Sequence, residues 1–330
     1  MISYSISAII PAFNCGSTLE RAVYSLINQL FPPDEIIIIN NNSTDKTQKI
    51  IDNLIAENPD LIISVFEQKP GANAARNSGL KIAKGDWIQL LDADDELLPD
   101  KLKHQIELIH NNPDSDVIYA DSKEYLFSKK TAKYELHKTN FVAYDLIEGL
   151  INSTLGRTNA NLWKRSALEK VNYFDENKKS NQEYFLMLSL YETGAKFFKD
   201  PVINSKIYVD GDSISRTSDG PRSVEMLRTR LEYFQSLRQV LKNKKELSDA
   251  LLSKIKKKIR LSYYNNYYNY NNVCKEELLK LKVNYDIQPT LTDKVITHAH
   301  QVYSQNCPKK GIAKYFIFIY YFFAKINRIN

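Results

Sequence analysis

An acidic run that follows an apolar segment is the strongest chemical signal in this chain. Apolar residues 87–91 lead directly into Asp92, Asp94 and Asp95, which are three carboxylates within four positions. Carboxylates this close repel one another unless a cation or hydrogen-bond donors compensate their charge. Mg²⁺ or Mn²⁺ takes one or two carboxylates and completes its shell with water and phosphate oxygens. The run therefore predicts a site for a hard divalent cation.

A calcium loop or a helix cap would account for the acidic run less well. A calcium-binding EF-hand loop that began at Asp92 would need glycine and glutamate where this chain has Leu97 and Lys103. Alternatively, Asp94 and Asp95 could cap a helix that opens just after them. A cap accounts for one carboxylate and leaves the remaining two without a role.

The elements that must position these carboxylates alternate between β-rich runs and helical periodicity. This pattern predicts βαβ units and a mainly parallel sheet flanked by helices. Serines are expected to cap two helices, Ser17 in a capping box with Glu20 and Ser43 before the next helix. We expect strands at 6–10, 35–39, 61–66, 87–91 and 117–119, helices at 72–83, from Pro99 and at 182–192, and an antiparallel excursion to about His137.

Polar segments lie where this sheet would bind a ligand. Residues 11–14 and 40–45 follow the first two expected strands, and residues 71–77, with Arg76, lead into the helix before residues 87–91. Open α/β sheets bind ligands beyond the carboxyl ends of their strands. No GxGxxG motif follows a strand and there is no Walker A lysine, so any phosphate would be held by metal and side chains.

These segments resemble the inverting glycosyltransferases of family 2, which have the GT-A fold. The resemblance covers about residues 7–215, and its elements occur in the family's order. They are residues 8–14 (AIIPAFN), 35–45 (EIIIINNNSTD), 75–79 (ARNSG), 91–95 (LDADD) and 182–188 (QEYFLML). Each element alone is weak, whereas five in order are a strong signal.

The resemblance implies a nucleotide-sugar donor and a divalent metal, Mn²⁺ or Mg²⁺. It implies that Asp94 touches the metal and that Asp92, in the same DxD motif, contacts the donor. The remaining donor-binding residues that it implies are Pro11, Phe13, Asn14, Asn41 and Arg76. An amide at Asn41 accepts a uracil or thymine imide N–H, whereas guanine, with two adjacent N–H donors, favours a carboxylate. UDP or dTDP is therefore expected rather than GDP.

Glycosyl transfer also needs a base for the acceptor hydroxyl, since the anomeric carbon becomes oxocarbenium-like as the diphosphate leaves. By resemblance that base is Glu183, where the family commonly has aspartate. The alternative is an exposed carboxylate that the helix dipole favours near a first turn. A second departure is that Asn40 and Asn41 stand at commonly acidic positions. A catalytically inactive glycan-binding relative is the alternative function.

Composition and charge divide the chain into two parts. With 43% hydrophobic and 25% charged residues it is an ordinary globular sequence, which excludes disorder. Residues 1–215 carry 23 basic and 30 acidic side chains, whereas residues 216–330 carry 22 and 9. We expect a catalytic domain at 1–215 and a basic, mainly helical region at 216–330 that faces something anionic. Interleaved tyrosines at 263–272 are a weak signal for nucleic acid, which we do not expect as a partner.

The compartment and the partners are less sharply indicated. Cys15, Cys274 and Cys307 form no CxxC pair, and residues 1–11 lack a basic signal-peptide region, so a cytoplasmic protein is expected. The aromatic run 315–324 would span about 15 Å as a helix, too short to cross a bilayer of roughly 30 Å. Residues 312–330 are instead expected to lie on the inner membrane surface. The alternative is that they pack against the catalytic domain or against a second subunit of a homo-oligomer. The expected acceptor is a glycan or lipid-linked saccharide, as in polysaccharide biosynthesis.

Overall fold

The computed structural model describes residues 4–178, 180–209, 219–290 and 293–294. The chain divides into two compact units. The first comprises residues 1–216 with 239–246, and the second comprises 217–238 with 247–330.

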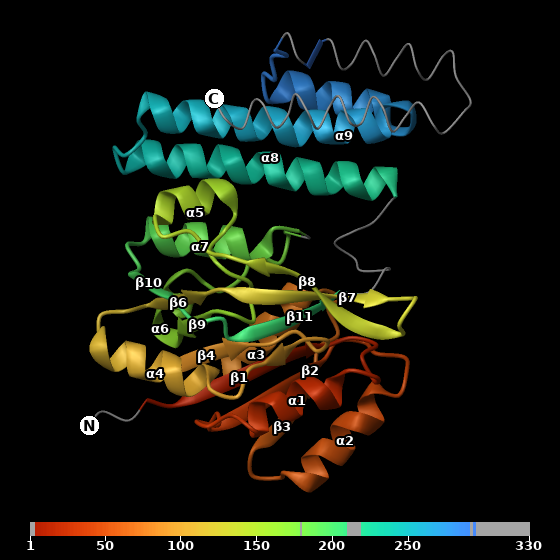
Figure 1. The fold of residues 1–330 in the computed structure, drawn as a ribbon, viewed down its shortest axis with the longest axis vertical. Coiled ribbons are helices and arrows are strands. Elements are labelled where there is room, and N and C mark those ends of the chain that lie inside the picture. The colour runs from red at the N-terminus through yellow and green to blue at the C-terminus, as the bar shows by residue number, and fades with distance from the viewer. Residues whose placement is uncertain (1–3, 179, 210–218, 291–292, 295–330) are drawn as a thin grey trace. The chain divides into compact units, whose positions relative to one another are not determined.

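A seven-stranded sheet forms the centre of the first unit (Figure 1). Its strands are parallel except for β9, which runs antiparallel to both of its neighbours. This confirms the predicted mainly parallel α/β architecture. In spatial order the strands are β10 (Phe197–Asp200), β6 (Val117–Ala120), β9 (Leu162–Lys164), β4 (Trp87–Leu90), β1 (Ile6–Ala12), β2 (Glu35–Asn40) and β3 (Ile62–Phe66).

Helices cover both faces of this sheet, as the strand sequences require. All of Ile36–Ile39 is buried, which is typical of a strand with both faces covered. Even-numbered residues of β1 pack under α1 (Leu19–Ile27) and α2 (Thr47–Glu57), and Ile6 packs under α4 (Lys101–Asn111). On the opposite face, α3 (Ala72–Ile82) lies so close that a Cβ on Gly79 would be 2.6 Å from Cγ2 of Ile9.

A second sheet of four strands completes the first unit. Its first strand begins two residues after Asp94. The expected antiparallel excursion is present as a hairpin of β7 (Ser122–Ser128) and β8 (Lys133–Asn140). Its order is β5 (Glu96–Leu97), β11 (Ser205–Val209), β7 (Ser122–Ser128) and β8 (Lys133–Asn140). The remaining helices of this unit are α5 (Leu146–Asn152), α6 (Arg165–Lys170) and α7 (Gln182–Glu192).

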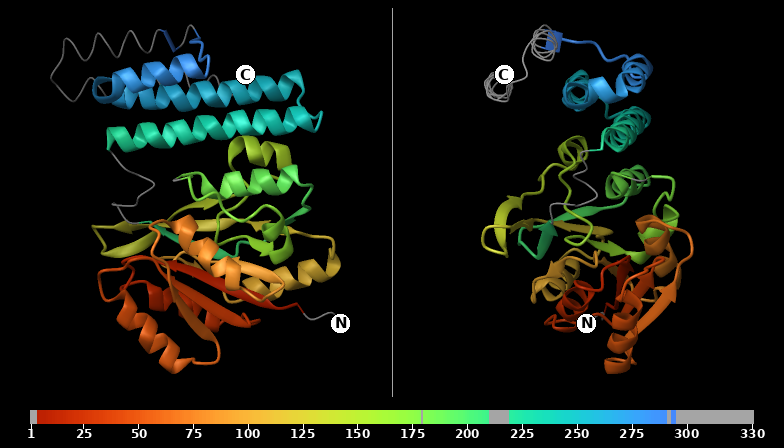
Figure 2. Two further views of the ribbon diagram at one scale, coloured as in Figure 1. Left: turned by 180° about the vertical axis from the view of Figure 1, so that it is seen from behind. Right: turned by 90° about the vertical axis from the view of Figure 1, so that its right-hand side faces the viewer.

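The second unit is helical where it is described. Within this unit, the part of α8 (Gly220–Asn243) up to Arg238 lies side by side with α9 (Asp249–Asn284) (Figure 2). Tyr263 and Tyr264, from the stretch considered as a nucleic-acid surface, are buried in the core between these helices. Those two rings are therefore unavailable for stacking on bases. Among the described residues, none of the helices combines the length and apolar character needed to cross a membrane.

The predicted strands and helices are confirmed to within a few residues, but the predicted caps are wrong. Helix α1 begins after Thr18, and no side-chain cap forms there, so the Ser17 capping box is absent. Helix α2 begins at Thr47, well past Ser43, whose hydroxyl instead accepts the backbone N–H of Asn14. The N-cap of α4 is Asp100, so neither Asp94 nor Asp95 serves as a helix cap.

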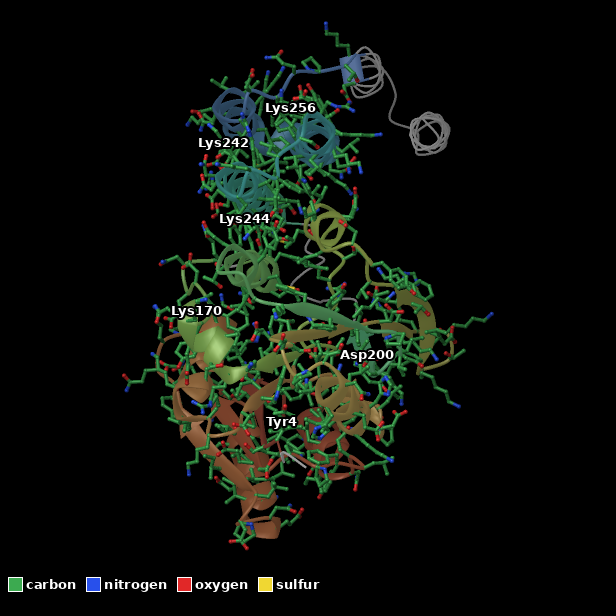
Figure 3. All side chains as sticks on the ribbon, turned by 90° about the vertical axis from the view of Figure 1, so that its left-hand side faces the viewer. Tyr4, Lys170, Asp200, Lys242, Lys244 and Lys256 are labelled. Carbon is green, nitrogen blue, oxygen red and sulfur yellow. The ribbon has the colours of Figure 1, made fainter. Side chains whose placement is uncertain are left out.

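A lysine lies fully inside the first unit, which the sequence did not predict. Nζ of Lys101 donates to Oε1 of Gln89 at 2.5 Å and to Oε1 of Gln105 at 2.6 Å. Burial lowers its pKa to about 7, although the nearby carboxylate of Asp200 (Figure 3) acts in the opposite direction. The protein thus holds a lysine that loses its proton near neutral pH.

This lysine makes folding stability depend on pH. Below pH 7 Lys101 is protonated in both the folded and the unfolded chain, so it contributes no pH dependence. Between pH 7 and about 10.5 only the unfolded chain keeps the proton, so the contribution of Lys101 to stability rises with pH, by at most about 1.4 kcal/mol per unit. In urea unfolding, the free energy of unfolding of wild type minus that of Lys101→Met should increase from pH 7 to pH 10. A difference that stays constant from pH 7 to pH 10 would contradict the assignment.

Candidate functional site

The loops after β1, β2 and β4 meet at one edge of the sheet because these three strands are parallel neighbours. The backbone N–H of Asn41 donates to the carbonyl of Ala12 at 2.8 Å, which joins the first two loops. The N–H of Leu91 donates to the carbonyl of Ile9 at 3.0 Å, which joins the third strand end to the first. The polar segments found in the sequence therefore share one location.

The loop after β1 is shaped by Asn14. This residue has a φ of 48°, a left-handed conformation that asparagine tolerates better than most side chains. Its Oδ1 accepts the backbone N–H of Thr44 at 2.8 Å, so the loop is tied to the segment after β2. Phe13 is 58% exposed, and Pro11 is half-buried. The exposed ring offers a flat apolar surface at the sheet edge.

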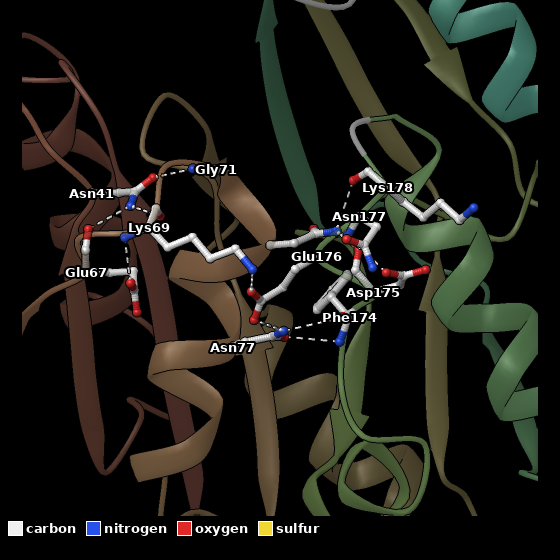
Figure 4. A network of polar contacts seen from close by, with 11 residues as sticks. Asn41, Glu67, Lys69, Gly71, Asn77, Phe174, Asp175, Glu176, Asn177 and Lys178 are labelled. Carbon is white, nitrogen blue, oxygen red and sulfur yellow. Dashed lines mark hydrogen bonds and ion pairs between the residues drawn. The ribbon is translucent and has the colours of Figure 1, made fainter.

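Asn41 is a buried amide that holds the segment after β3 (Figure 4). Its Nδ2 donates to the carbonyls of Glu67 and Lys69 at 2.9 and 2.8 Å. Its Oδ1 accepts the N–H of Gly71 at 2.8 Å. Gly71 has a φ of 131°, which requires glycine. Both amide protons of Asn41 are thus committed, and Oδ1 can accept one further hydrogen bond.

The three aspartates after β4 have three different environments. Asp92 is half-buried and forms an ion pair with Arg76 at 2.6 Å. Asp94 is exposed, and its backbone carbonyl accepts from the guanidinium of Arg21. Asp95 is buried and accepts the N–H of Tyr208 at 2.9 Å and Nδ2 of Asn159 at 2.8 Å. The third carboxylate therefore anchors the loop to β11.

Electrostatic strain at this loop favours a cation. Burial, followed by the charges of Asp94 and Asp92, raises the pKa of Asp95 well above its usual range. In the part of the chain that the structure describes, no three His, Cys, Asp or Glu side chains converge as a complete metal cage. Asp92 and Asp94 are instead the partial oxygen set that suits Mg²⁺ or Mn²⁺ with phosphate and water as the other ligands. The donor set fits such an ion.

Arg76 links this loop to α7. Its guanidinium is buried, with Nη2 on Asp92 and Nη1 donating to Oε1 of Gln182 at 2.9 Å. The same group lies over the ring of Phe174, 5.5 Å from its centre. The sequence identified Arg76 but gave no indication of Gln182 or Phe174 as its partners.

Glu183 is the second residue of α7, directly after Gln182. Its side chain is partly exposed, and it has no hydrogen bond or ion pair with any described residue. The carboxylate is thus open to an incoming group. The sheet edge gathers Pro11, Phe13, Asn14, Asn41, Arg76, Asp92 and Asp94, and Arg76 connects this edge to the residue before Glu183.

A separate groove of about 490 Å³ lies between α3, the segment 171–177 and α7. Asn77 and Phe185 line it, whereas Asp92, Asp94 and Glu183 do not. The groove is therefore distinct from the loop after β4 that carries Asp92, Asp94 and Asp95, which we call the carboxylate loop.

Comparison with known proteins gives one family. The model described as Glycosyl transferase family 2 matches residues 7–171. An uncharacterized glycosyltransferase of Rickettsia typhi is 28% identical over 212 residues, 62% of this chain and 64% of that protein. The succinoglycan biosynthesis protein ExoO of Rhizobium meliloti is 24% identical over 224 residues, 64% of this chain and 62% of that protein. The chain thus matches a little less than two thirds of the length of these relatives.

Solved structures share the fold. The S. aureus TarS fragment 1–349 in complex with UDP-GlcNAc has a TM-score of 0.63 at 16% identity and covers 85% of this chain and 80% of its own. The mannosyltransferase PcManGT from Pyrobaculum calidifontis, in complex with GDP-Man and Mn²⁺, has a TM-score of 0.57 at 14% identity and covers 93% and 82%. These likenesses confirm the predicted GT-A fold.

Proposed function

The chain belongs to glycosyl transferase family 2, and from this premise we propose that it moves a sugar from a nucleotide-sugar donor to a hydroxyl group, with inversion at the anomeric carbon. The observation that carries the proposal is the path of contacts from Asp92 through Arg76 to Gln182. This path joins the carboxylate loop to the helix that presents Glu183. Inverting transfer needs positive charge at the leaving diphosphate and a base at the acceptor hydroxyl. The group that compensates the diphosphate and the base must therefore lie close to the same sugar.

The diphosphate end of the donor belongs at Asp92 and Asp94. A divalent ion held by these carboxylates would supply positive charge where the leaving group becomes negative. A neighbour of the same fold binds GDP-Man with Mn²⁺, which supports this role. Arg76 fixes Asp92 in place, and Asp95 anchors the loop behind it.

The nucleobase belongs near Phe13 and Asn41. Phe13 offers an exposed ring, and Oδ1 of Asn41 can accept one more N–H. One remaining acceptor suits the single imide N–H of uracil or thymine, whereas guanine presents two adjacent N–H donors. The donor is therefore a UDP- or dTDP-sugar. TarS, of similar fold, binds UDP-GlcNAc.

The acceptor hydroxyl belongs at Glu183, whose carboxylate acts as the base. The acceptor is a glycan or a lipid-linked saccharide of a polysaccharide pathway, as the relative ExoO suggests by its succinoglycan role. Peripheral membrane contact through residues 312–330 remains a prediction, because these residues lie outside the part that the structure describes.

The metal assignment predicts the behaviour of Asp94→Asn. This exposed side chain lies at a strand end, so its change should leave the fold intact while Mn²⁺-dependent donor binding is lost. Calorimetry with UDP and UDP-sugars, with and without Mn²⁺, measures this directly. Asp60→Asn removes one exposed carboxylate elsewhere and is the matched control. Unchanged Mn²⁺-dependent affinity in Asp94→Asn would refute the assignment.

The base pocket predicts nucleotide preference. In the presence of Mn²⁺, UDP or dTDP should bind the wild-type protein about tenfold more tightly than GDP. Oδ1 of Asn41 can accept only one of the two N–H groups of guanine, and a buried donor without an acceptor costs roughly 1–3 kcal/mol. Competition calorimetry gives the three affinities under identical conditions. Tighter binding of GDP would contradict the assigned role of Asn41.

The base assignment predicts a loss of transfer in Glu183→Gln. Glutamine keeps the shape of the side chain but removes its basicity, so transfer should fall by about 10²-fold or more while donor binding is retained. Glu183→Asp keeps a carboxylate and should retain partial activity. Glu192→Gln, on the exposed last turn of the same helix, is the control. Near-wild-type transfer by Glu183→Gln would exclude it as the base.

A further inference from the structure

Three polar side chains on α3 are buried although nothing in the proposed chemistry requires all of them. Asn73, Arg76 and Asn77 are 3%, 6% and 4% exposed. Their spacing of three and four residues puts them on one face of the helix. Each of them donates to the segment 174–182, which lies about a hundred positions later in the chain.

Asn77 holds the start of that segment (Figure 4). Its Nδ2 donates to the carbonyl of Phe174 at 2.9 Å, and its Oδ1 accepts the N–H of the same residue at 3.0 Å. These two hydrogen bonds have the same pattern as the pair that two opposite residues form between antiparallel β-strands. Nδ2 also donates to Glu176 at 2.9 Å, and the second oxygen of Glu176 pairs with Nζ of Lys69 at 2.6 Å. The pKa of Glu176 is lowered, chiefly by that lysine.

Asn73 and Arg76 hold the remainder. Nδ2 of Asn73 donates to the carbonyls of Asp175 and Lys178 at 2.8 and 3.3 Å. Arg76 bonds Gln182, whose own Nε2 donates to the carbonyl of Lys178 at 3.3 Å. The segment is therefore fixed to α3 at its start, its middle and its end.

Three residues with a left-handed backbone lie in this segment or just before it. Asn172, Tyr173 and Asn181 have φ values of 56°, 65° and 52°, a left-handed conformation that asparagine tolerates and that costs Tyr173 about 1–2 kcal/mol. Helix α7 has no side-chain hydrogen bond at its N-cap. The contacts with α3 hold the start of α7 at Gln182, and Tyr184, one position after Glu183, donates to the carbonyl of Ser153 at 2.7 Å.

We propose that Asn73, Arg76 and Asn77 act as a clamp on the segment 174–182, and that this clamp sets the position of Glu183 relative to the carboxylate loop. Gln182 is then the positioning residue for Glu183. The proposal rests on the proposed function, because it takes Glu183 as the base. Gln182 touches neither the donor loop nor a reacting atom, and it acts through its bond to Arg76. Arg76 in turn binds Asp92. The two contacts Gln182–Arg76 and Arg76–Asp92 therefore connect the residue before Glu183 to the carboxylate loop.

Gln182→Met tests this role, because methionine has nearly the same length and no acceptor. A misplaced base slows the chemical step without weakening donor binding, and displacements near 1 Å cost up to about 10²-fold. We expect kcat for transfer to fall about tenfold or more while KM for the donor stays within about twofold. Gln182→Glu restores an oxygen acceptor for Arg76 and should bring kcat back to within about threefold of wild type.

Asn77→Ala gives an independent reading at the other end of the clamp. It leaves the N–H and carbonyl of Phe174 without their partner and should lower thermal stability as well as kcat. Should this variant fail to fold, the Gln182 pair still decides the question. An Asn177→Ala control changes an exposed neighbour whose side chain makes no hydrogen bond with any described residue, and it should keep wild-type kcat.

The outcomes separate the two claims. If Glu183→Gln loses transfer while Gln182→Met keeps wild-type kcat, the positioning role is overturned and the proposed function stands. If Glu183→Gln keeps full transfer, the role of Glu183 is overturned and the clamp has no base to position. Loss of kcat in Gln182→Met without rescue by Gln182→Glu also contradicts positioning through Arg76.

Discussion

The buried guanidinium of Arg76 is the interaction on which the rest of the site depends. A buried charge is costly unless it is paired and hydrogen-bonded. Arg76 has Asp92 at Nη2 and Gln182 at Nη1, while its buried Nε has no partner among the described residues. To reach both partners, α3 must lie very close to the sheet. Gly79 allows this approach, because a larger residue would meet the side chain of Ile9. One packing constraint thus sets where the carboxylate loop and α7 can be.

The carboxylate loop is held from behind as well as from the side. Asp95 accepts two hydrogen bonds, one from the backbone of β11 and one from Asn159. It therefore ties the end of the large sheet to the small sheet. Asp92 and Asp94 remain nearer the surface, where solvent and a ligand can reach them. The three aspartates thus differ in environment: Asp95 is buried and anchors the loop, Asp92 is paired with Arg76, and Asp94 is exposed.

Much of this arrangement was predictable from the sequence, and the reason is its strong local pattern. The strands of β1 and β2 are long apolar runs, and Gln182–Glu192 was expected and found as a helix. The predicted cap of α2 is wrong because Ser43 accepts a hydrogen bond from the backbone of Asn14 instead, and the capping box predicted for α1 is wrong because that helix begins after Thr18. The bond from Arg76 to Gln182 joins residues 106 positions apart, and the burial of Lys101 depends on Gln89 and Gln105. No local pattern contains such pairings, so the partners of these side chains emerged only from the fold.

The choice of amides around the site follows from the hydrogen bonds that they make. Asn41, Asn73 and Asn77 each bind backbone groups, which requires a donor and often an acceptor on one side chain. A carboxylate cannot donate, so it could not form the bonds that these amides make to backbone carbonyls. Gln182 uses both ends of its amide, since Oε1 accepts from Arg76 and Nε2 donates to the carbonyl of Lys178. Glu183 is then the acidic residue in the first turn of α7, and it keeps its carboxylate free because its neighbour makes the structural bond.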